Sequence, residues 1–262
     1  MTANTWTDGA DPGELALSYA RHAGTLRGAV RQALVTRGLF AHLPAAPQRV
    51  LDIGGGTGHQ AIALARAGHS VVLLDPDEAA LGYATQALSV QPAQVRDRVR
   101  VVPGRGEDAA ELVGSGFDAA CCHGVLMYLR DPHRMLAALG GAVRPGGLLS
   151  IVTKNGEALA MRPGLEGRWA DAIAVLDSDA ETGNLGVASR GDTVEGISAA
   201  LAGAGVQTVA WYGVRALTDH LRDTPVGADF DQIVDAEWAV GQRDPYRRVA
   251  RLFHLVARRS GS

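Results

Sequence analysis

The stretch from Val50 to Gly58 has the residue types and spacing best suited to binding a cofactor. An apolar run leads into Asp52, and a glycine cluster follows it: Gly54, Gly55, Gly56 and Gly58. Glycines let a backbone turn sharply off a strand and approach a nucleotide closely. A second apolar run, Ser70 to Leu74, ends in Asp75, where an acid can accept hydrogen bonds from two ribose hydroxyls. The sequence therefore predicts a site for an adenosine-containing cofactor.

The spacing of the glycines distinguishes between two kinds of cofactor. A dinucleotide site needs G-x-G-x-x-G, which brings a helix N-terminus to the pyrophosphate. Here the glycines alternate as G-x-G-x-G after Asp52, and an acid would repel a pyrophosphate. The same acid suits a cationic amino-acid group, such as that of S-adenosylmethionine. A dehydrogenase and an ordinary turn of an α/β protein stay as alternatives, because a glycine run alone is a weak signal.

The pattern resembles motif I of the class I S-adenosylmethionine-dependent methyltransferases, and residues 48 to 155 follow that family's order of elements. The resemblance implies an α/β fold. Its sheet would be doubly wound and Rossmann-like, mostly parallel, with an antiparallel pair of strands at the C-terminal edge. The implied cofactor is S-adenosyl-L-methionine. Its expected contacts are Asp52, the glycines, Asp75, Pro76, Gly106, Glu107 and His123.

Hydrophobic periodicity and turn residues predict the elements that position these side chains. The expected helices are Gly13 to Phe40, Gln60 to Ala67, one starting near Pro76 or Asp77, and His133 to Val143. The expected strands after Ser70 to Leu74 are Val99 to Val102, Phe117 to His123, Leu148 to Thr153, Val206 to Val214 and Leu252 to Ala257. We interpret residues 1–262 as one domain, with an N-terminal helical segment over 1–47 and a cofactor-binding core over 48–155. Segments 156–205 and 215–248 are expected to cover the substrate.

Composition limits the classes of function. The chain has 262 residues, 47% of them hydrophobic, and a net charge of −3, which gives no global attraction to nucleic acid or an anionic membrane. No apolar run is long enough to cross a bilayer, and the first residues do not resemble a signal peptide, so we expect a cytoplasmic protein. Cys121 and Cys122 are adjacent and are expected to be buried filler. No metal site is expected.

A narrower resemblance runs nearly end to end, to the tRNA 5-carboxymethoxyuridine methyltransferases known as CmoM. It rests on three places: Gly24 to Gln32, Thr208 to Leu221, and Glu237 with Asp244 to Arg247 and Ala250 to Arg258. It implies tRNA as the partner, and tRNA modification as the process. The chain departs from that family at Arg27, at Val125 to Tyr128 and in segment 155–191, where Asp177, Asp179 and Glu181 would repel phosphate.

The implied reaction esterifies a carboxylate, which is already ionised at neutral pH and needs no general base. A guanidinium that grips the carboxylate with two bonds would orient it. The candidates are Arg31, Arg215 and Arg247. In the resemblance Arg31 contacts the cofactor carboxylate, which leaves Arg215 and Arg247 for the substrate.

His123 has two interpretations, a cofactor contact, as the resemblance implies, or a general base for a hydroxyl or amine acceptor. His254, within an apolar run, is expected to be a satisfied core histidine. The arginine-rich stretch from Arg243 to Arg259 is either an anticodon-stem footprint or a solvated surface. Trp238 and Tyr246 are either base-stacking or core residues.

Three functions stay open at this point. One is a tRNA carboxyl methyltransferase. The second is a small-molecule O- or carboxyl-methyltransferase of secondary metabolism, which suits the acidic segment and the low net charge better. The third is a non-catalytic cofactor-binding protein, against which Asp52, the glycines and Asp75 argue. The sequence predicts no oligomeric state.

Overall fold

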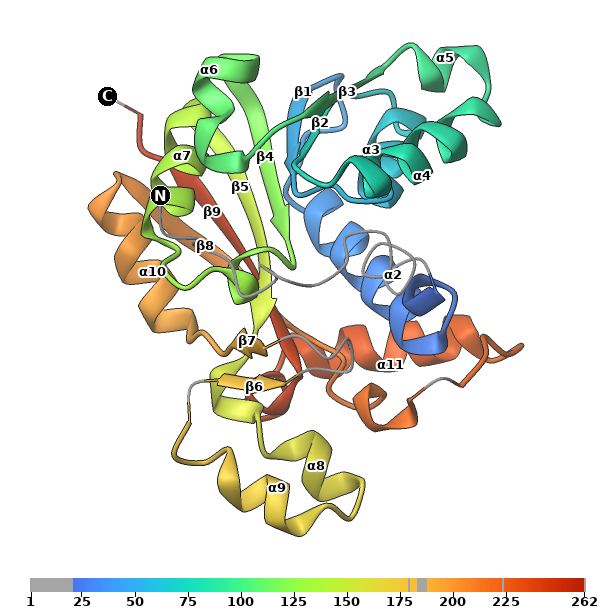
Figure 1. Ribbon diagram of the computed structural model, residues 1–262, viewed down its shortest axis with the longest axis vertical. Helices are drawn as coiled ribbons and strands as arrows, with labels where there is room; N and C mark the ends of the chain where they lie inside the picture. Colours follow the sequence, from blue (N-terminus) through green and yellow to red (C-terminus); the bar gives the residue numbers. More distant parts are fainter. Residues whose placement is uncertain (1–20, 179, 183–187, 223, 262) are drawn as a thin grey trace.

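The computed structural model describes residues 21–178, 180–182, 188–222 and 224–261, and its centre is a seven-stranded sheet of order β3-β2-β1-β4-β5-β9-β8 (Figure 1). Strands β1 to β5 pair in parallel, and β9 is antiparallel to β5 and β8. This confirms the predicted fold class. The strands are β1 (Arg49–Ile53), β2 (Ser70–Asp75), β3 (Val99–Pro103), β4 (Phe117–His123), β5 (Val143–Lys154), β8 (Val206–Val214) and β9 (Leu252–Arg259).

Helices cover both faces of the sheet. One layer contains α2 (Leu26–Phe40), α3 (His59–Arg66), α4 (Glu78–Ser89) and α5 (Ala93–Arg96); the other contains α6 (Ala109–Val113), α7 (His133–Ala142) and α10 (Val194–Gly203). Successive strand residues point to opposite faces. Cys121 accordingly packs in one layer and Cys122 in the other, and both thiols are free and buried, as predicted.

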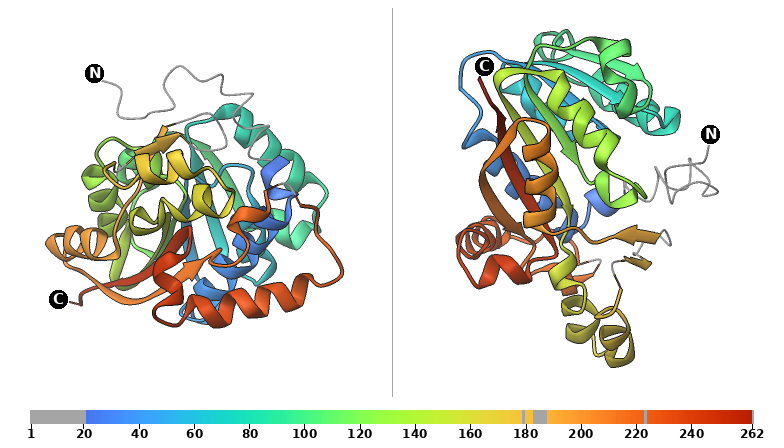
Figure 2. Two further views of the ribbon diagram at one scale, coloured as in Figure 1. Left: turned by 90° about the horizontal axis from the view of Figure 1, so that it is seen from below. Right: turned by 90° about the vertical axis from the view of Figure 1, so that its left-hand side faces the viewer.

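A projecting segment follows the carboxyl end of β5. It contains the 3-10 helix η3 (Gly156–Ala158), α8 (Met161–Leu165), α9 (Trp169–Ala174) and the hairpin of β6 (Ala180–Thr182) and β7 (Ala188–Arg190). Figures 1 and 2 show α8 and α9 extending away from the sheet. Helix α10 instead packs against β8 and α7, so the predicted insertion 156–205 includes one helix of the layer over the sheet.

The segment between β8 and β9 contains η4 (Asp219–Leu221), α11 (Phe230–Gly241) and η5 (Tyr246–Val249). Helix α11 packs its apolar side on α2. Trp238 of α11 stacks on Tyr212, with ring centroids 4.9 Å apart. Its ring is therefore packed within the fold, in agreement with the core interpretation of Trp238.

The predicted helix from Gly13 to Phe40 is wrong in one respect, since the chain breaks at Thr25. Residues 13–20 lie outside the described residues. Thr25 is extended, and its hydroxyl caps a new helix by accepting from the Gly28 amide at 3.2 Å. A Cβ at Gly28 would lie 2.0 Å from the His22 carbonyl oxygen, so this glycine allows the preceding segment to cross the start of α2.

Candidate functional site

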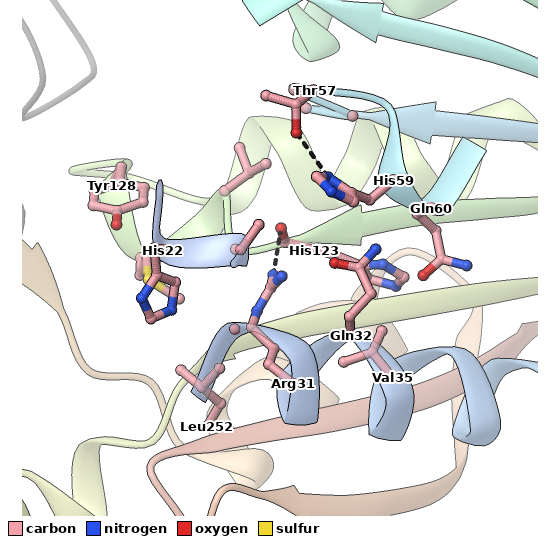
Figure 3. Close-up of a pocket in the computed structure, with 18 of the residues that line it drawn as sticks. His22, Arg31, Gln32, Val35, Thr57, His59, Gln60, His123, Tyr128 and Leu252 are labelled. Atoms are coloured by element: carbon pink, nitrogen blue, oxygen red, sulfur yellow. Dashed lines mark hydrogen bonds between the residues drawn. The ribbon is translucent and has the colours of Figure 1, made fainter. Parts of the chain in front are cut away.

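A cavity of about 400 Å³ lies at the carboxyl ends of the parallel strands, where ligands bind in doubly wound sheets. Figure 3 shows the walls that α2, the glycine loop after β1 and the end of β4 contribute. Short 3-10 helices η1 (Gly106–Asp108) and η2 (Leu126–Tyr128) follow β3 and β4. The cavity brings together most of the predicted site residues: Arg31, Asp52, Gly54, Gly55, Gly56, Asp75, Pro76, His123 and Arg215.

The glycine loop needs its glycines for steric reasons. Gly54, Gly56 and Gly58 have φ values of 66, 52 and 82°, in the region that side chains disfavour. A Cβ at Gly54 would lie 2.2 Å from Cγ2 of Val125. The Gly56 amide donates to the Asp75 carboxylate at 2.8 Å, which ties the loop to the end of β2.

The Asp75 carboxylate is held by backbone amides at the cavity edge. One oxygen accepts from Gly56 and the other accepts from the Asp77 amide at 2.9 Å. Each carboxylate oxygen keeps a further lone pair for a bound molecule. Burial raises the pKa of Asp75, while the two amide bonds oppose that rise.

The Asp52 carboxyl group lies beneath the glycine loop and is 2% exposed. Its Oδ2 has no hydrogen-bond partner among the described residues. Burial, with repulsion from Asp75, raises the pKa of Asp52 to about 7. A bound cation would stabilise the ionised carboxylate and provide the missing partner.

Arg31 joins α2 to the end of β4. Its guanidinium donates to the His123 carbonyl at 3.0 Å (Figure 3). A Cβ at Gly124 would lie 2.9 Å from this guanidinium, so the glycine makes room for Arg31. Arg31 is thus a fixed cation close to both Asp52 and His123.

These features fit the implied cofactor. Asp75 can accept from ribose hydroxyls, Asp52 can neutralise an ammonium group, and the glycines allow close approach. The strongest support for this cofactor is the buried Oδ2 of Asp52, which has no hydrogen-bond partner among the described residues. A buried acceptor without a partner destabilises the fold, and the ammonium group of the cofactor would provide that partner.

His123, Ser150 and His254 form a hydrogen-bonded chain across β4, β5 and β9. The distances are 2.8 Å from His123 Nε2 to Ser150 Oγ and 2.7 Å from Ser150 Oγ to His254 Nε2. His254 is fully buried, as predicted, although its Nδ1 has no partner among the described residues.

The wall opposite the glycine loop is cationic. Lys154, Arg162, Arg215 and Arg251 line it, with Asp219 among them. Arg162 forms a hydrogen-bonded ion pair with Asp219, and Lys154 donates to Ser189. Burial, with repulsion from Arg251 and Arg162, lowers the pKa of Lys154 to about 6.

Arg215 is the predicted substrate residue that the cavity does contain. It is buried, its Nη2 lies 3.3 Å from Asp219, and its Nε has no partner among the described residues. Its φ is 63°, so the backbone adopts a left-handed conformation to turn this side chain inward.

Other predicted residues lie outside the cavity lining. Arg247 pairs with Asp244 at 2.8 Å and covers the Trp211 ring at 4.0 Å, so its prediction as a substrate residue is corrected. Arg247 is not among the residues that line the cavity. Gly106 packs on Ile53 and Met135, and Glu107 faces Arg105. The lining does not include Gly58, which caps α3.

The C-terminal arginines do not form one surface. Arg251 lines the cavity, whereas Arg258 and Arg259 donate to the carbonyls of Gly146 and Val143. Three of the six arginines from Arg243 to Arg259 therefore line the cavity or make contacts within the fold, and they do not favour the interpretation as an anticodon-stem footprint. Tyr246 is half exposed.

Sequence reasoning missed Lys154, Arg162, Ser189 and Arg251. The chain's only lysine, Lys154, was the one visible signal, because an isolated lysine in an arginine-rich chain is unusual. Within the described ranges, no cluster of His, Cys, Asp or Glu could hold a metal ion. Nor does that part of the chain contain a helix that is both long and apolar enough to cross a bilayer.

Comparison with known proteins agrees with this geometry. Residues 51–149 match a family described as a methyltransferase domain. The tRNA 5-carboxymethoxyuridine methyltransferase of Escherichia coli (strain K12) is 29% identical over 254 residues, covering 95% of this chain and 96% of that protein. A ubiquinone biosynthesis O-methyltransferase of Xanthomonas axonopodis pv. citri is 36% identical over 116 residues, 44% of this chain and 46% of that protein.

Solved structures show the same fold. A putative S-adenosylmethionine-dependent methyltransferase from Listeria monocytogenes has a TM-score of 0.61 at 17% identity, covering 88% of this chain and 99% of that one. A putative methyltransferase in complex with the Haloferax volcanii Trm112 activator has a TM-score of 0.62 at 17% identity, covering 95% and 97%. Residues 51–149 thus match a methyltransferase domain, and the whole chain has the fold of S-adenosylmethionine-dependent methyltransferases.

Proposed function

We propose that this methyltransferase esterifies the carboxylate of 5-carboxymethoxyuridine in tRNA. The observation that carries the proposal is that one cavity is lined by two chemically different groups of residues from opposite halves of the sheet. Asp52 and Asp75 lie on β1 and β2, and the buried side chains of Arg215 and Arg251 lie next to β8 and β9. The similarity to the E. coli tRNA 5-carboxymethoxyuridine methyltransferase, which extends over 95% of the chain, supports this acceptor.

At the cofactor end, each residue has one task. S-adenosylmethionine supplies an electrophilic methyl group when bound. Asp75 would accept hydrogen bonds from the ribose, and Asp52 would pair with the ammonium group. Arg31, from α2, would pair with the cofactor carboxylate. Gly54, Gly55 and Gly56 keep the loop free of side chains.

At the acceptor end, orientation of the nucleophile provides most of the catalysis. A carboxylate is ionised at neutral pH, so the protein needs only to desolvate it and align its oxygen. Arg215 offers a fork of donors inside the cavity. Arg215 must not bind the carboxylate too strongly, because stabilising the bound acceptor before the reaction would raise the activation barrier. Asp219 pairs with Arg162 and Arg215, and this pairing weakens the attraction of Arg215 for the acceptor.

Labelled S-adenosylmethionine and total RNA from the source cell provide the test. Methyl transfer is measured for the wild-type protein and for Arg215→Gly. Arg243→Ala is the matched control, because Arg243 is an exposed arginine just after α11. We expect alkali-labile label in RNA, lost with Arg215→Gly and retained with Arg243→Ala. Alkali-stable label, or no label in RNA despite cofactor binding, would contradict the proposal.

A second candidate is a small-molecule carboxyl- or O-methyltransferase. The net charge of −3, and the hydrogen bonds that Arg258 and Arg259 make to backbone carbonyls of the fold, favour it. The same assay on a metabolite extract distinguishes the two, since label would then appear in low-molecular-weight products.

A further inference from the structure

Gln60, in the first turn of α3, carries a buried amide whose hydrogen-bonding capacity the protein does not fill. The residue lines the cavity and is 8% exposed. Its contact among the described residues is with Thr36 of α2, whose hydroxyl lies 3.4 Å from the Gln60 Oε1. The Nε2 atom is buried and has no hydrogen-bond partner in the described part of the chain. The amide is therefore held at the cavity wall by one neighbour.

The shortage of acceptors does not depend on which way the amide is turned. An amide nitrogen has two hydrogens to donate. If the amide were reversed, the Thr36 hydroxyl would accept one of them, and the other would need a further acceptor. Thr36 alone thus satisfies the amide in neither orientation. Because buried donors without an acceptor are rare and destabilising, we expect a bound molecule to supply the acceptor.

The start of α3 is a second feature that favours a negatively charged group. Gly58 is the N-cap residue, no side chain caps this end of the helix, and its first turn contains no acid. The free backbone N–H groups and the helix dipole stabilise an anion at such a helix start. Thr57, His59 and Gln60, which surround the start of α3, all line the cavity. The acceptor that Gln60 needs and an anion at α3 can therefore be one group.

The contact with α2 indicates which group of the cofactor this is. Figure 3 shows the Gln60 side chain extending from the start of α3 toward α2, the helix that carries Arg31. Thr36 is five residues after Arg31, about 7.5 Å further along the helix axis. A carboxylate that accepts hydrogen bonds of about 2.9 Å on both sides covers a similar distance. The ammonium group of the cofactor can only donate, so the carboxylate is the acceptor at the amino-acid end.

We propose that Gln60 binds the cofactor carboxylate together with Arg31 and makes the site selective for a cofactor that retains this carboxylate. The inference rests on the proposed pairing of Arg31 with that carboxylate, and it is independent of the methyl acceptor. Arg31 supplies the opposite charge. Gln60 adds a directional hydrogen bond without placing a second cation close to Asp52, which is already near Arg31. Removal of the Gln60 amide should therefore affect only ligands that have the carboxylate.

Calorimetric titration with two ligands tests this selectivity. The ligands are S-adenosylmethionine and decarboxylated S-adenosylmethionine, which keeps the ammonium group. Gln60→Met removes the amide at similar side-chain length, and Gln86→Met, at an exposed glutamine of α4, is the matched control. We expect Gln60→Met to raise the Kd of S-adenosylmethionine by about tenfold or more, and to leave the Kd of the decarboxylated ligand unchanged. Gln86→Met should change neither value.

A second variant reverses the interaction. Gln60→Glu places a carboxylate against that of the cofactor, so it should weaken S-adenosylmethionine more than Gln60→Met does and spare the decarboxylated ligand. Equal losses for the two ligands, or no loss for either, would overturn the inference. A lower melting temperature of the free Gln60→Met protein, combined with equal losses, would assign Gln60 to the fold instead. None of these titrations involves RNA, so their failure is distinguishable from failure of the labelling experiment.

Discussion

Arg162 on α8 and Asp219 on η4 form a buried ion pair with two hydrogen bonds, of which the one from Nη2 to Oδ1 is 3.0 Å long. The pair joins the segment after β5 to the segment after β8. Both side chains are about one tenth exposed, at 9% and 10%. A buried pair of this kind is costly to break, because the remaining charge is left desolvated.

Asp219→Ala should therefore destabilise the protein by about 3–5 kcal/mol, as measured by urea denaturation. Although burial raises the pKa of Asp219, Arg215 and Arg162 hold it below its ordinary value. A depressed carboxyl pKa stabilises the fold above the unfolded-state pKa, and this contribution is lost as the pH falls through the folded-state value. Asp235→Ala, which removes an exposed partner of Arg37, is the control and should cost about 0–1 kcal/mol. Equal effects of the two variants would contradict the structural role of Asp219.

Arg215→Gly should reduce kcat by about 10²-fold while the cofactor Kd stays unchanged, because the side chain orients only the acceptor. Glycine is the chosen replacement since φ is 63° at this position, and the variant removes the side chain without straining the backbone. Stopped-flow turnover and calorimetric cofactor titration measure the two quantities separately. Weakened cofactor binding with unchanged turnover would show that Arg215 contacts the cofactor and not the acceptor.

Asp75→Ala should weaken cofactor binding by about 10²-fold or more, since two charge-assisted hydrogen bonds to the ribose are lost. Asp118, an acid at the opposite end of the sheet from the cavity, provides the control Asp118→Ala. Isothermal titration of both variants, with circular dichroism to verify folding, tests the assignment. Unchanged affinity in Asp75→Ala would refute it.

Cofactor affinity should depend on pH through Asp52, whose pKa burial raises to about 7. An ammonium group binds the ionised form, so binding must displace a proton below that pH. The affinity should fall by up to about tenfold for each pH unit below 7 and level off above it. Asp52→Asn should weaken binding and remove this slope. A flat profile in the wild-type protein would mean that Asp52 does not meet the cation.

Lys154→Met should remove a pH dependence of stability. Burial lowers the pKa of Lys154 from 10.5 to about 6, so the unfolded chain binds more protons between these values. Stability of the wild-type protein should therefore rise with pH across this window, at no more than about 1.4 kcal/mol per pH unit from this group. Thermal unfolding of both proteins at several pH values measures the difference. Identical slopes would show that Lys154 stays protonated in the folded protein.

The cofactor end of the site was predictable from sequence because its residues are close together in the chain. Asp52 lies in β1, the glycines follow that strand directly, and Asp75 ends β2, so local pattern and strand order suffice to place them. The break at Thr25 was missed because apolar periodicity continues through it and only the capping geometry reveals it.

The acceptor end could not be predicted in the same way. Arg162 in α8 and Arg251 before β9 are far apart in the chain and both line the cavity, and each looks ordinary among many arginines. The sequence does not reveal that Arg251 lines the cavity while Arg247 pairs with Asp244 outside it. A positive φ at Arg215 is likewise invisible without coordinates.

Mutations can change the residues at one end of the cavity without changing those at the other. Most of the residues proposed to bind the cofactor lie in one short stretch of chain, from Asp52 to Pro76, and Arg31 and His123 complete the set. Lys154, Arg162, Arg215 and Arg251 lie at the end of β5, in α8, after β8 and before β9. A library that randomises only those four positions samples new acceptors and leaves every residue of the glycine loop unchanged. Directed evolution toward other carboxylates can therefore begin from a scaffold whose methyl-donor binding is preserved.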